Sequence, residues 1–194
     1  MASDGRGRWA MCSFVAPGAL ALEAEGDVVE EPAPAPALTV AFAPVKGERT
    51  EWVVQKLTEL GIDRIALVVA ARSVVRWDPA RQRSVLDRLG RVVREAGAQS
   101  RRVWLPELVG PSPLAEVVSS AGSASGLALA EPGGGELPAT LAGIAIGPEG
   151  GWAPEEVALG RPLVRLADHV LRTETAAVAA AALLCARRTG TVGQ

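Results

Sequence analysis

Histidine and cysteine are scarce in this sequence. Its 194 residues include one histidine, His169, and two cysteines, Cys12 and Cys185, which lie far apart in the chain. Zinc sites and disulfide frameworks use these residues at short, recurring spacings such as Cys-x-x-Cys, and no such spacing occurs here. We therefore expect no metal centre and no disulfide, and we expect both thiols to be free in apolar surroundings.

Long apolar runs are absent too. The longest, residues 176–186, is shorter than the roughly 20 residues that a transmembrane helix requires. The N-terminus lacks the charged-then-apolar layout of a secretory signal peptide. With 48% apolar and 22% charged residues, the composition is that of a globular chain, long enough for one domain or for one domain with a fragment of a second. We expect a soluble cytoplasmic protein that does not enter the membrane.

The common motifs of nucleotide and hydrolase sites are missing as well. There is no G-x-x-x-x-G-K-[ST] loop, no G-x-G-x-x-G after a strand-like run and no G-x-S-x-G. A P-loop, a Rossmann dinucleotide site and a nucleophile elbow are therefore unsupported. Any ligand of this chain must be held by a different arrangement.

Charge is distributed unevenly along the chain. The formal net charge is only −2, but residues 72–102 contain nine arginines and three acids, whereas residues 23–31 contain five acids and no base. Arginine suits phosphate contact because its planar guanidinium offers paired donors. The block can equally be the solvated face of a helix in an arginine-rich protein, since 18 of the 20 basic residues are arginine.

Two different patterns follow one another along the chain. Residues 9–16, 19–25 and 27–30 are short β-prone runs separated by turn signals, and a stiff proline-rich linker follows at residues 32–36. So few short strands would leave an open sheet edge. From residue 38 onward, strand-like and helix-like patterns alternate, which predicts an α/β domain with a mainly parallel sheet.

The alternating part has recognisable element boundaries. Val53, Leu57 and Leu60 have the spacing of one buried helix face, and Asp78 followed by Pro79 is typical of a helix start. The predicted strands are residues 38–42, 64–70, 103–108, 127–130, 143–146 and 163–167, and the predicted helices are residues 47–60, 78–99, a short one from Pro154, and one capped by Thr173 or Thr175 that ends at Arg188.

Two loops at predicted strand ends are unusual. Residues 147–151, Gly-Pro-Glu-Gly-Gly, follow the apolar strand 143–146, and a polar stretch at residues 166–175 lies between a strand and an alanine-rich helix. Glycine permits positive φ and close approach of other groups, and a loop before a helix offers unpaired backbone N–H groups. Because ligands of α/β sheets bind at the carboxyl ends of strands, we expect a ligand at these loops.

Four segments, taken in order, resemble the motifs of one enzyme family. They are Lys46-Gly-Glu-Arg-x-Glu-Trp-Val-Val-Gln-Lys-x-Thr-Glu-Leu-Gly61, Glu95-Ala-x-x-Gln99-Ser100, Ile146-Gly-Pro-Glu-Gly-Gly-Trp-x-Pro-Glu-Glu156 and Leu171-Arg-Thr-Glu-Thr-Ala-Ala177. The family is that of the 16S ribosomal RNA uridine N3-methyltransferases (RsmE), which belongs to the SPOUT superfamily of S-adenosylmethionine enzymes. The resemblance covers about residues 38–190.

The resemblance implies a fold, partners and a cofactor. Residues 37–194 would form a SPOUT-type α/β domain with a C-terminal trefoil knot, and residues 1–36 would be the remnant of a PUA-like RNA-binding β-barrel with a linker. The partners would be a second copy of the chain, in a homodimer, and 16S rRNA in the small ribosomal subunit. S-adenosylmethionine would be cradled at the knot, with glycine needed where a Cβ would occupy the cofactor's place. The implied cofactor-binding residues are Leu129, Ala130, Glu131, Ile146, Gly147, Pro148, Glu149, Gly150, Gly151, Leu166, Leu171, Thr173 and Thr175.

The implied reaction requires few catalytic side chains, because the methyl donor is already activated. The uracil N3 proton must be lost, and Glu174 and Glu149 are candidate acceptors. Arg172 or Arg72 would stabilise the negative charge that develops on the uracil carbonyl oxygens. Glu174 can equally be a first-turn carboxylate that complements a helix dipole, and Glu149 can simply hold its loop.

RNA contacts are expected within the basic block, residues 72–102. Gln99, Ser100 and Arg101 are equally suited to the C-terminal end of a helix. Trp152 is expected to pack beneath its loop and not to stack on a base. The candidate RNA-binding residues are Arg76, Arg94, Gln99, Ser100, Arg101 and Arg102.

The chain departs from the family pattern in four places, one of which is Ala98, where a glutamate usually precedes Gln-Ser. Residues 70–73 read Ala-Ala-Arg-Ser where members commonly carry Ser-Glu-Arg-Ser, and residues 167–169 read Ala-Asp-His where Gly-Pro-Arg is common. Residues 4–7 already resemble a segment midway through the barrel, so we expect an incomplete N-terminal unit and reduced affinity for RNA. The alternatives to an enzyme are a non-catalytic RNA-binding or ribosome-assembly factor and a nucleotide-binding regulatory module.

Overall fold

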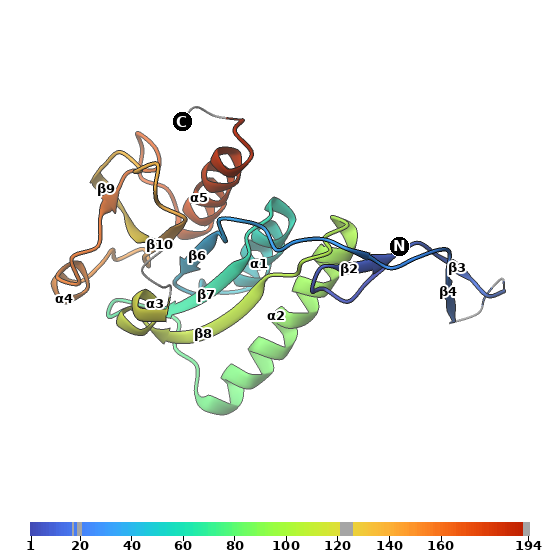
Figure 1. The fold of residues 1–194 in the computed structure, drawn as a ribbon. Coiled ribbons are helices and arrows are strands. Elements are labelled where there is room, and N and C mark those ends of the chain that lie inside the picture. Colours follow the sequence, from blue (N-terminus) through green and yellow to red (C-terminus); the bar gives the residue numbers. More distant parts are fainter. Residues whose placement is uncertain (17, 19–20, 121–125, 192–194) are drawn as a thin grey trace.

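The computed structural model describes residues 1–16, 18, 21–120 and 126–191. An α/β unit is built around one sheet, and a set of short N-terminal strands extends from one side of it, beside the C-terminal end of the longest helix (Figure 1). The two predicted patterns thus correspond to two differently built parts of the molecule.

Six strands form the sheet of the α/β unit. Every pair of neighbouring strands is parallel. The carboxyl ends of the strands therefore meet at a common edge, and the predicted α/β class with a mainly parallel sheet is confirmed. In spatial order the strands are β11 (Leu163–Val164), β9 (Leu127–Gly135), β10 (Gly143–Ile146), β6 (Thr39–Phe42), β7 (Arg64–Val69) and β8 (Glu107–Pro113).

The two faces of the sheet bury different side chains in two separate cores, because successive strand residues point to opposite faces. Phe42 and Ile144 belong to a core formed with α1 (Arg49–Leu60), α2 (Pro79–Gln99) and α5 (Thr173–Arg188). The smaller Ala41 and Ala145 belong to a second core, which includes residues of α3 (Leu114–Ser120). The sheet is thus covered on both faces, as its apolar strands predict.

Two helix starts, those of α2 and α4 (Pro154–Val157), follow the local signals. The Asp78 side chain accepts a hydrogen bond from the Arg81 backbone N–H at 2.9 Å, and α2 begins at Pro79 as predicted. The short helix α4 also begins at the predicted proline. The threonine caps predicted for α5 are wrong, because Arg172 occupies the N-cap position and makes no side-chain cap bond.

Several predicted boundaries are displaced. The strand predicted at residues 103–108 is β8 at Glu107–Pro113, because Val103 and Leu105 bond instead with the N-terminal part: the Gly7 N–H donates to the Val103 carbonyl and the Leu105 N–H to the Gly5 carbonyl. Helix α3 was not predicted. Strand β9 is longer than predicted and β11 is shorter. Leu60, predicted to be buried, is 36% exposed, and the buried face of α1 includes Val54 in its place.

The N-terminal strands form two small antiparallel sheets. One contains β1 (Ala2–Ser3), β2 (Arg8–Ala10) and β5 (Val29–Glu30), and the other contains β3 (Cys12–Phe14) and β4 (Leu22–Ala24). Residues 19 and 20 of the strand predicted at 19–25 lie outside the described residues. The Trp104 indole N–H donates to the Glu31 carbonyl at 3.1 Å. This part buries few large apolar side chains, and Phe14 is 67% exposed.

A partly buried ion-pair cluster joins the ends of three helices. Asp63, which follows α1, contacts Arg102 at 3.3 Å and also contacts Arg188 at the end of α5. All three side chains are less than one fifth exposed, and burial lowers the pKa of the Arg102 guanidinium. Cys185 nearby is a free, half-buried thiol whose pKa is raised by burial, and Cys12 is also free.

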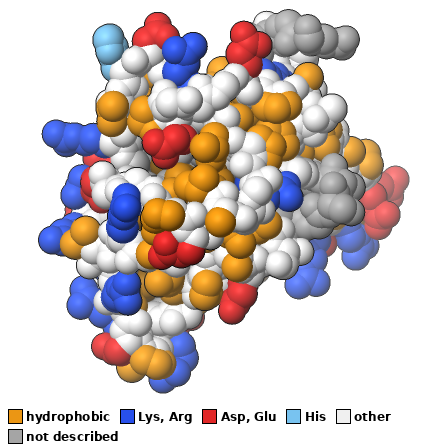
Figure 2. Space-filling model, turned by 90° about the vertical axis from the view of Figure 1, so that its left-hand side faces the viewer, with side chains coloured by type: hydrophobic (Ala, Val, Ile, Leu, Met, Phe, Trp, Pro, Cys, Tyr) orange, Lys and Arg blue, Asp and Glu red, His pale blue; other side chains and the backbone are white. Residues whose placement is uncertain are grey.

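The outer surface on the α4 and β9 side is mixed in character. Hydrophobic side chains gather across its middle, and many of its basic side chains lie toward its edges (Figure 2). Within the described part of the chain, no helix is both long and apolar enough to span a membrane.

Candidate functional site

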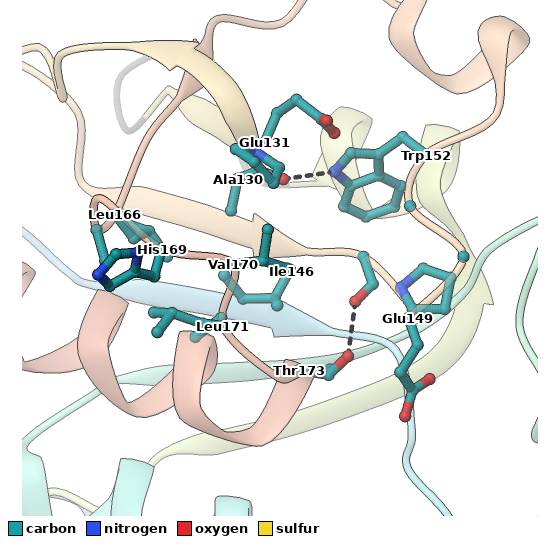
Figure 3. A pocket seen from close by; sticks show the side chains of 17 residues that line it. Ala130, Glu131, Ile146, Glu149, Trp152, Leu166, His169, Val170, Leu171 and Thr173 are labelled. Carbon is teal, nitrogen blue, oxygen red and sulfur yellow. Dashed lines mark hydrogen bonds between the residues drawn. The ribbon is translucent and has the colours of Figure 1, made fainter.

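A cavity of about 320 Å³ opens at the carboxyl edge of the sheet, close to the end of β10 (Figure 3). Its walls come from residues 130–132 within β9, residues 146–152 after β10, and residues 166–173, which lead into α5. Its volume lies within the usual range of small-molecule sites. The cavity therefore lies where the two unusual loops predict a ligand.

The loop at residues 147–151 is a tight turn. The Gly151 N–H donates to the Pro148 carbonyl at 2.8 Å, and the φ of Gly151 is 70°, in the left-handed region that favours glycine. A Cβ on Gly147 would approach the Trp152 indole to 3.1 Å, and one on Gly150 would approach the Arg72 side chain to 3.3 Å. These two glycines therefore permit packing within the protein, which corrects the expectation that a cofactor takes the place of their Cβ atoms. A Cβ on Gly151 would meet no protein atom within 4 Å.

Two side chains hydrogen-bond from one wall of the cavity to another. The Trp152 indole is buried beneath its loop, as the sequence predicts, and its N–H donates to the Ala130 carbonyl at 3.1 Å. The Thr173 hydroxyl donates to the Gly147 carbonyl at 3.1 Å (Figure 3). The three segments are thus tied together by hydrogen bonds to backbone carbonyls.

The loop after β7 supports the loop after β10 from outside the cavity. Glu156 is buried, and its two carboxylate oxygens accept hydrogen bonds from the Ala153 N–H at 2.8 Å and from the Ala71 N–H at 2.9 Å. The Arg72 guanidinium donates to the Gly150 carbonyl at 2.9 Å. Arg72, a predicted catalytic residue, therefore contacts the backbone of the glycine loop.

The cavity offers an apolar surface with few ionisable groups. Ile146, Leu166 and Leu171 supply apolar lining, and among the described lining residues only Glu131, Glu149 and His169 carry ionisable side chains. The described residues contain no group of three or more His, Cys, Asp or Glu side chains placed to hold a metal ion. Such a site suits a ligand held largely by backbone groups that itself supplies the reactive atom.

Most residues that the resemblance assigns to the cofactor line the cavity. Leu129 and Thr175 do not: Leu129 is fully buried in the core on the α3 side, and Thr175 is exposed on α5. The assigned residues that line it are Ala130, Glu131, Ile146, Gly147, Pro148, Glu149, Gly150, Gly151, Leu166, Leu171 and Thr173. The lining residues outside this set are Pro132, Trp152, Ala167, His169, Val170 and Ala176. Trp152 and Ala176 lie inside the quoted motifs, the residues at 167, 169 and 170 lie in the loop where a ligand is expected, and Pro132 follows the assigned Glu131.

Glu174, a predicted catalytic residue, does not line the cavity. Its carboxylate lies 3.1 Å from the Arg49 guanidinium of α1 and is only 13% exposed. Burial raises the pKa of Glu174, but hydrogen bonds from its own backbone N–H and from Arg49 together outweigh this effect and hold the pKa below its ordinary value. Arg172 is exposed at the N-cap position of α5, between the lining residues Leu171 and Thr173.

The predicted RNA-binding residues are not all available at the surface. Arg102 donates to the carbonyls of Thr58 and Ile62 at 2.9 and 2.7 Å, so its guanidinium is used within the protein and we remove it from the RNA-binding set. Ser100 is the C-cap residue of α2, and its hydroxyl donates to the Ala96 carbonyl at 2.7 Å. The remaining candidates, Arg76, Arg94, Gln99 and Arg101, are exposed.

The fold and the cavity, together with the sequence match, define an RNA methyltransferase domain. The family model with that description matches residues 31–185. The ribosomal RNA small subunit methyltransferase E of Mycobacterium bovis is 37% identical over an alignment of 195 residues, which covers 91% of this chain and 74% of that protein. The chain therefore belongs to the ribosomal RNA small subunit methyltransferase E family, in agreement with the resemblance of its motifs.

Solved structures of similar proteins share the fold. A probable rRNA-methyltransferase from Porphyromonas gingivalis gives a TM-score of 0.79 at 26% identity, with 98% of this chain and 84% of that chain covered. A ribosomal RNA small subunit methyltransferase E from Neisseria gonorrhoeae, solved bound to S-adenosyl methionine, gives a TM-score of 0.77 at 26% identity, with 95% and 81% covered.

Proposed function

We propose that this protein is an S-adenosylmethionine-dependent methyltransferase that modifies N3 of a uridine in the 16S rRNA of the small ribosomal subunit. The observation that carries the proposal is the cavity between residues 146–152 and 166–173, in a chain of the ribosomal RNA small subunit methyltransferase E family. The choice of uridine and of its N3 atom rests on the motif resemblance.

The residues of the cavity fit the cofactor. Ile146, Leu166 and Leu171 provide an apolar surface suited to a planar adenine, and the neighbouring backbone can pair with its ring nitrogens. The position that a Cβ of residue 151 would take has no protein atom within 4 Å, so a ligand can approach the backbone there. Glu131 places a carboxylate on the lining, where it can accept hydrogen bonds from ribose hydroxyl or ammonium groups.

S-adenosylmethionine supplies a methyl group already activated by its sulfonium. The protein's own residues must orient the uracil, exclude water and assist loss of the N3 proton. Glu149 is an exposed carboxylate on the cavity lining, and we propose it as the proton acceptor in preference to Glu174. We propose that Arg172 stabilises charge on the uracil oxygens and that Arg72 positions the glycine loop through the Gly150 carbonyl.

The trefoil knot remains part of the proposal. Strand β11 lies at the edge of the sheet, beyond β9, whereas α5 packs against β10, β6 and α1. The connection at residues 165–172 must therefore cross the carboxyl ends of the intervening strands, and the Thr173 hydroxyl bond to Gly147 draws it against the loop after β10. This path supports a threaded C-terminal segment.

The two-part organisation and the homodimer are also proposals. The sheet of the α/β unit begins at Thr39, and the two small N-terminal sheets precede the linker at residues 32–36, which supports a PUA-like RNA-binding part at 1–36 and a SPOUT domain at 37–194. The homodimer rests on the motif resemblance.

The proposal is tested in two steps. Calorimetric titration with S-adenosylmethionine is expected to show one saturable site per chain, and its absence would remove the enzyme hypothesis. Small subunits that lack the modification are then incubated with the labelled cofactor, and nucleoside mass spectrometry is expected to find N3-methyluridine. Cofactor binding without transfer would favour an RNA-binding or assembly factor, and a methyl group on another atom would correct the proposed position.

A further inference from the structure

A second cleft lies at the same edge of the sheet, between the start of α1 and the first turns of α2. It has a volume of about 150 Å³. Because sites for complete small-molecule ligands usually occupy roughly 300 Å³ or more, this cleft suits a single charged group and not a whole cofactor. Its lining residues are Val45, Lys46, Gly47, Thr50, Glu51, Val75, Trp77, Arg81, Val85 and Arg88.

Positive charge dominates the lining of this cleft. Lys46 approaches it from the loop after β6, and Arg81 and Arg88 lie seven positions apart on one face of α2. Arg88 is paired with Glu51, the one acid of the lining, at 2.6 Å. Among the residues that the structure describes, Lys46 and Arg81 make no ion pair. Two cationic side chains are therefore left to attract an anion.

Two polar groups in the walls of the cleft, the Thr50 hydroxyl and the Arg81 backbone N–H, already have hydrogen-bond partners within the protein. The Thr50 hydroxyl is buried and hydrogen-bonds with both the N–H and the carbonyl of Val45 at 3.0 Å. The Arg81 backbone N–H, at the start of α2, is already taken by the Asp78 carboxylate. An anion in the cleft would therefore be held by the side chains of Lys46 and Arg81 and not by the Arg81 amide.

The cleft and the cofactor cavity are neighbours. The loop that carries Lys46 follows β6, which pairs with β10, and the Ala43 N–H donates to the Ile146 carbonyl at 3.0 Å. Arg49, three residues after Lys46, contacts Glu174 at the start of α5. A nucleic acid strand that enters the mouth of the cavity can therefore pass beside the cleft.

We propose that this cleft binds a phosphodiester of the RNA strand next to the target nucleotide, with Lys46 and Arg81 as the groups that contact it. The inference rests on the proposed function, because it presupposes an RNA substrate. Phosphate contacts fix the register and orientation of a strand without reading its sequence. Loss of such a contact weakens RNA binding and leaves the cofactor site unchanged.

The test compares Lys46→Gln and Arg81→Gln with the matched control Arg83→Gln. Arg83 is an exposed arginine of the same helix that does not line the cleft. Each test variant is expected to raise the KM for small subunits roughly 3- to 10-fold near 0.1 M salt. It is also expected to lower the steepness of log RNA affinity against log salt concentration by about one, because one fewer counterion is released on binding. The control is expected to move either quantity less than roughly 2-fold. The kcat, and the Kd for S-adenosylmethionine by calorimetry, are expected to stay at the wild-type values.

The outcomes separate this inference from the function on which it rests. If both test variants match Arg83→Gln in KM and in salt dependence, the phosphate site is wrong and the methyltransferase proposal stands. A fall in kcat with unchanged KM would also overturn the phosphate site. If the wild-type protein binds the cofactor but neither binds nor methylates RNA, the proposed function fails before any variant is compared, and the inference fails with it. Lys46→Gln lies in a loop, so it tests the site even if Arg81→Gln disturbs α2.

Discussion

The Arg49 guanidinium lies 3.1 Å from a carboxylate oxygen of Glu174, so that the first turn of α1 is joined to the first turn of α5. The second carboxylate oxygen of Glu174 is buried and has no hydrogen-bond partner among the described residues. Because the pKa of this carboxyl is lowered, the group is a weaker proton acceptor than an ordinary glutamate. The pair therefore serves to position α5, whose first residue lines the cofactor cavity.

Glu174→Gln is expected to retain more than about one tenth of the wild-type kcat, because loss of a general base usually costs roughly 100-fold or more. Steady-state methylation of small subunits measures this. Glu149→Gln, at our proposed proton acceptor, is the comparison and is expected to lose at least about 100-fold. A larger loss in Glu174→Gln than in Glu149→Gln would reverse the two assignments.

The same pair predicts a pH dependence of stability. The folded-state pKa of Glu174 is lowered, so the carboxylate stabilises the fold at any pH above its unfolded-state pKa, and this contribution is lost as the pH falls through the folded-state pKa. Wild type is therefore expected to exceed Glu174→Gln in free energy of unfolding at neutral pH, and the difference should shrink below about pH 4. Urea unfolding at several pH values measures it. A difference that grows on acidification would contradict the lowered pKa.

Glu156 supplies a second test, of the support behind the glycine loop. Its two oxygens accept from the backbone N–H groups of Ala71 and Ala153, and Glu156→Ala leaves both donors without this partner, although only Ala153 is a buried residue and Ala71 is exposed. The expected loss is about 1 to 3 kcal/mol in the free energy of unfolding, with weaker cofactor binding. Glu155→Ala, at the exposed neighbouring position, is expected to cost less than about 0.5 kcal/mol. Equal losses in the two variants would remove the positioning role of Glu156.

Gly151 and Gly160 form a matched pair for the cofactor site. Their φ angles are 70° and 68°, and a Cβ at either position would meet no protein atom within 4 Å. Alanine at each is therefore expected to cost a similar backbone strain, about 1 kcal/mol. Only Gly151 lines the cavity, so Gly151→Ala alone is expected to weaken binding of S-adenosylmethionine in calorimetry. Equal cofactor affinities in the two variants would show that the space beside Gly151 is not used by the ligand.

Local sequence signals predicted those elements whose boundaries are set by neighbouring residues. Asp78 and Pro79 mark the start of α2, and Gly61 ends α1 with a φ of 101°. The cap of α5 was wrong because the Thr173 hydroxyl bonds to the Gly147 carbonyl, 26 residues earlier in the chain. No local pattern indicates a partner at that distance. The predicted start of β8 was wrong for the same reason. Val103 and Leu105, predicted to belong to this strand, hydrogen-bond instead with the N-terminal part of the chain.

For the candidate site too, the sequence predicted the local features but not the contacts between distant residues. The motifs and the loops around them predicted two of the three walls of the cavity, residues 146–152 and 166–173, because the lining is nearly continuous in sequence within each of these loops. They did not predict the environment of the charged residues beside it. Glu174 meets Arg49 across 125 residues, and Arg72 meets the Gly150 carbonyl across 78 residues. Because of these contacts, we interpret Glu174 and Arg72 as residues that position the site and not as catalytic groups.

The partly buried cluster around Asp63 gives the largest expected effect on stability. Asp63→Asn keeps the size of the side chain and can still accept from the Leu38 N–H, but it leaves the positive charges of Arg102 and Arg188 without their carboxylate. Removing one partner of a fully buried ion pair costs about 3 to 5 kcal/mol, and because water reaches part of this cluster we expect a loss of about 2 to 4 kcal/mol. Asp168→Asn is the control, since Asp168 is 90% exposed and pairs with Arg165 at 3.8 Å, and it is expected to change the free energy of unfolding by less than about 1 kcal/mol.

The cluster lies at the C-terminal end of α5, whereas the cofactor cavity lies at the N-terminal end of the same helix. Under conditions in which the Asp63→Asn variant is folded, it is therefore expected to bind S-adenosylmethionine with nearly the wild-type Kd. Denaturant unfolding and calorimetry on the same preparation measure the two quantities separately. A large loss of cofactor affinity without a loss of stability would mean that α5 transmits the change along its length. A loss of stability no greater than that of Asp168→Asn would mean that water, and not Asp63, compensates the two guanidinium charges.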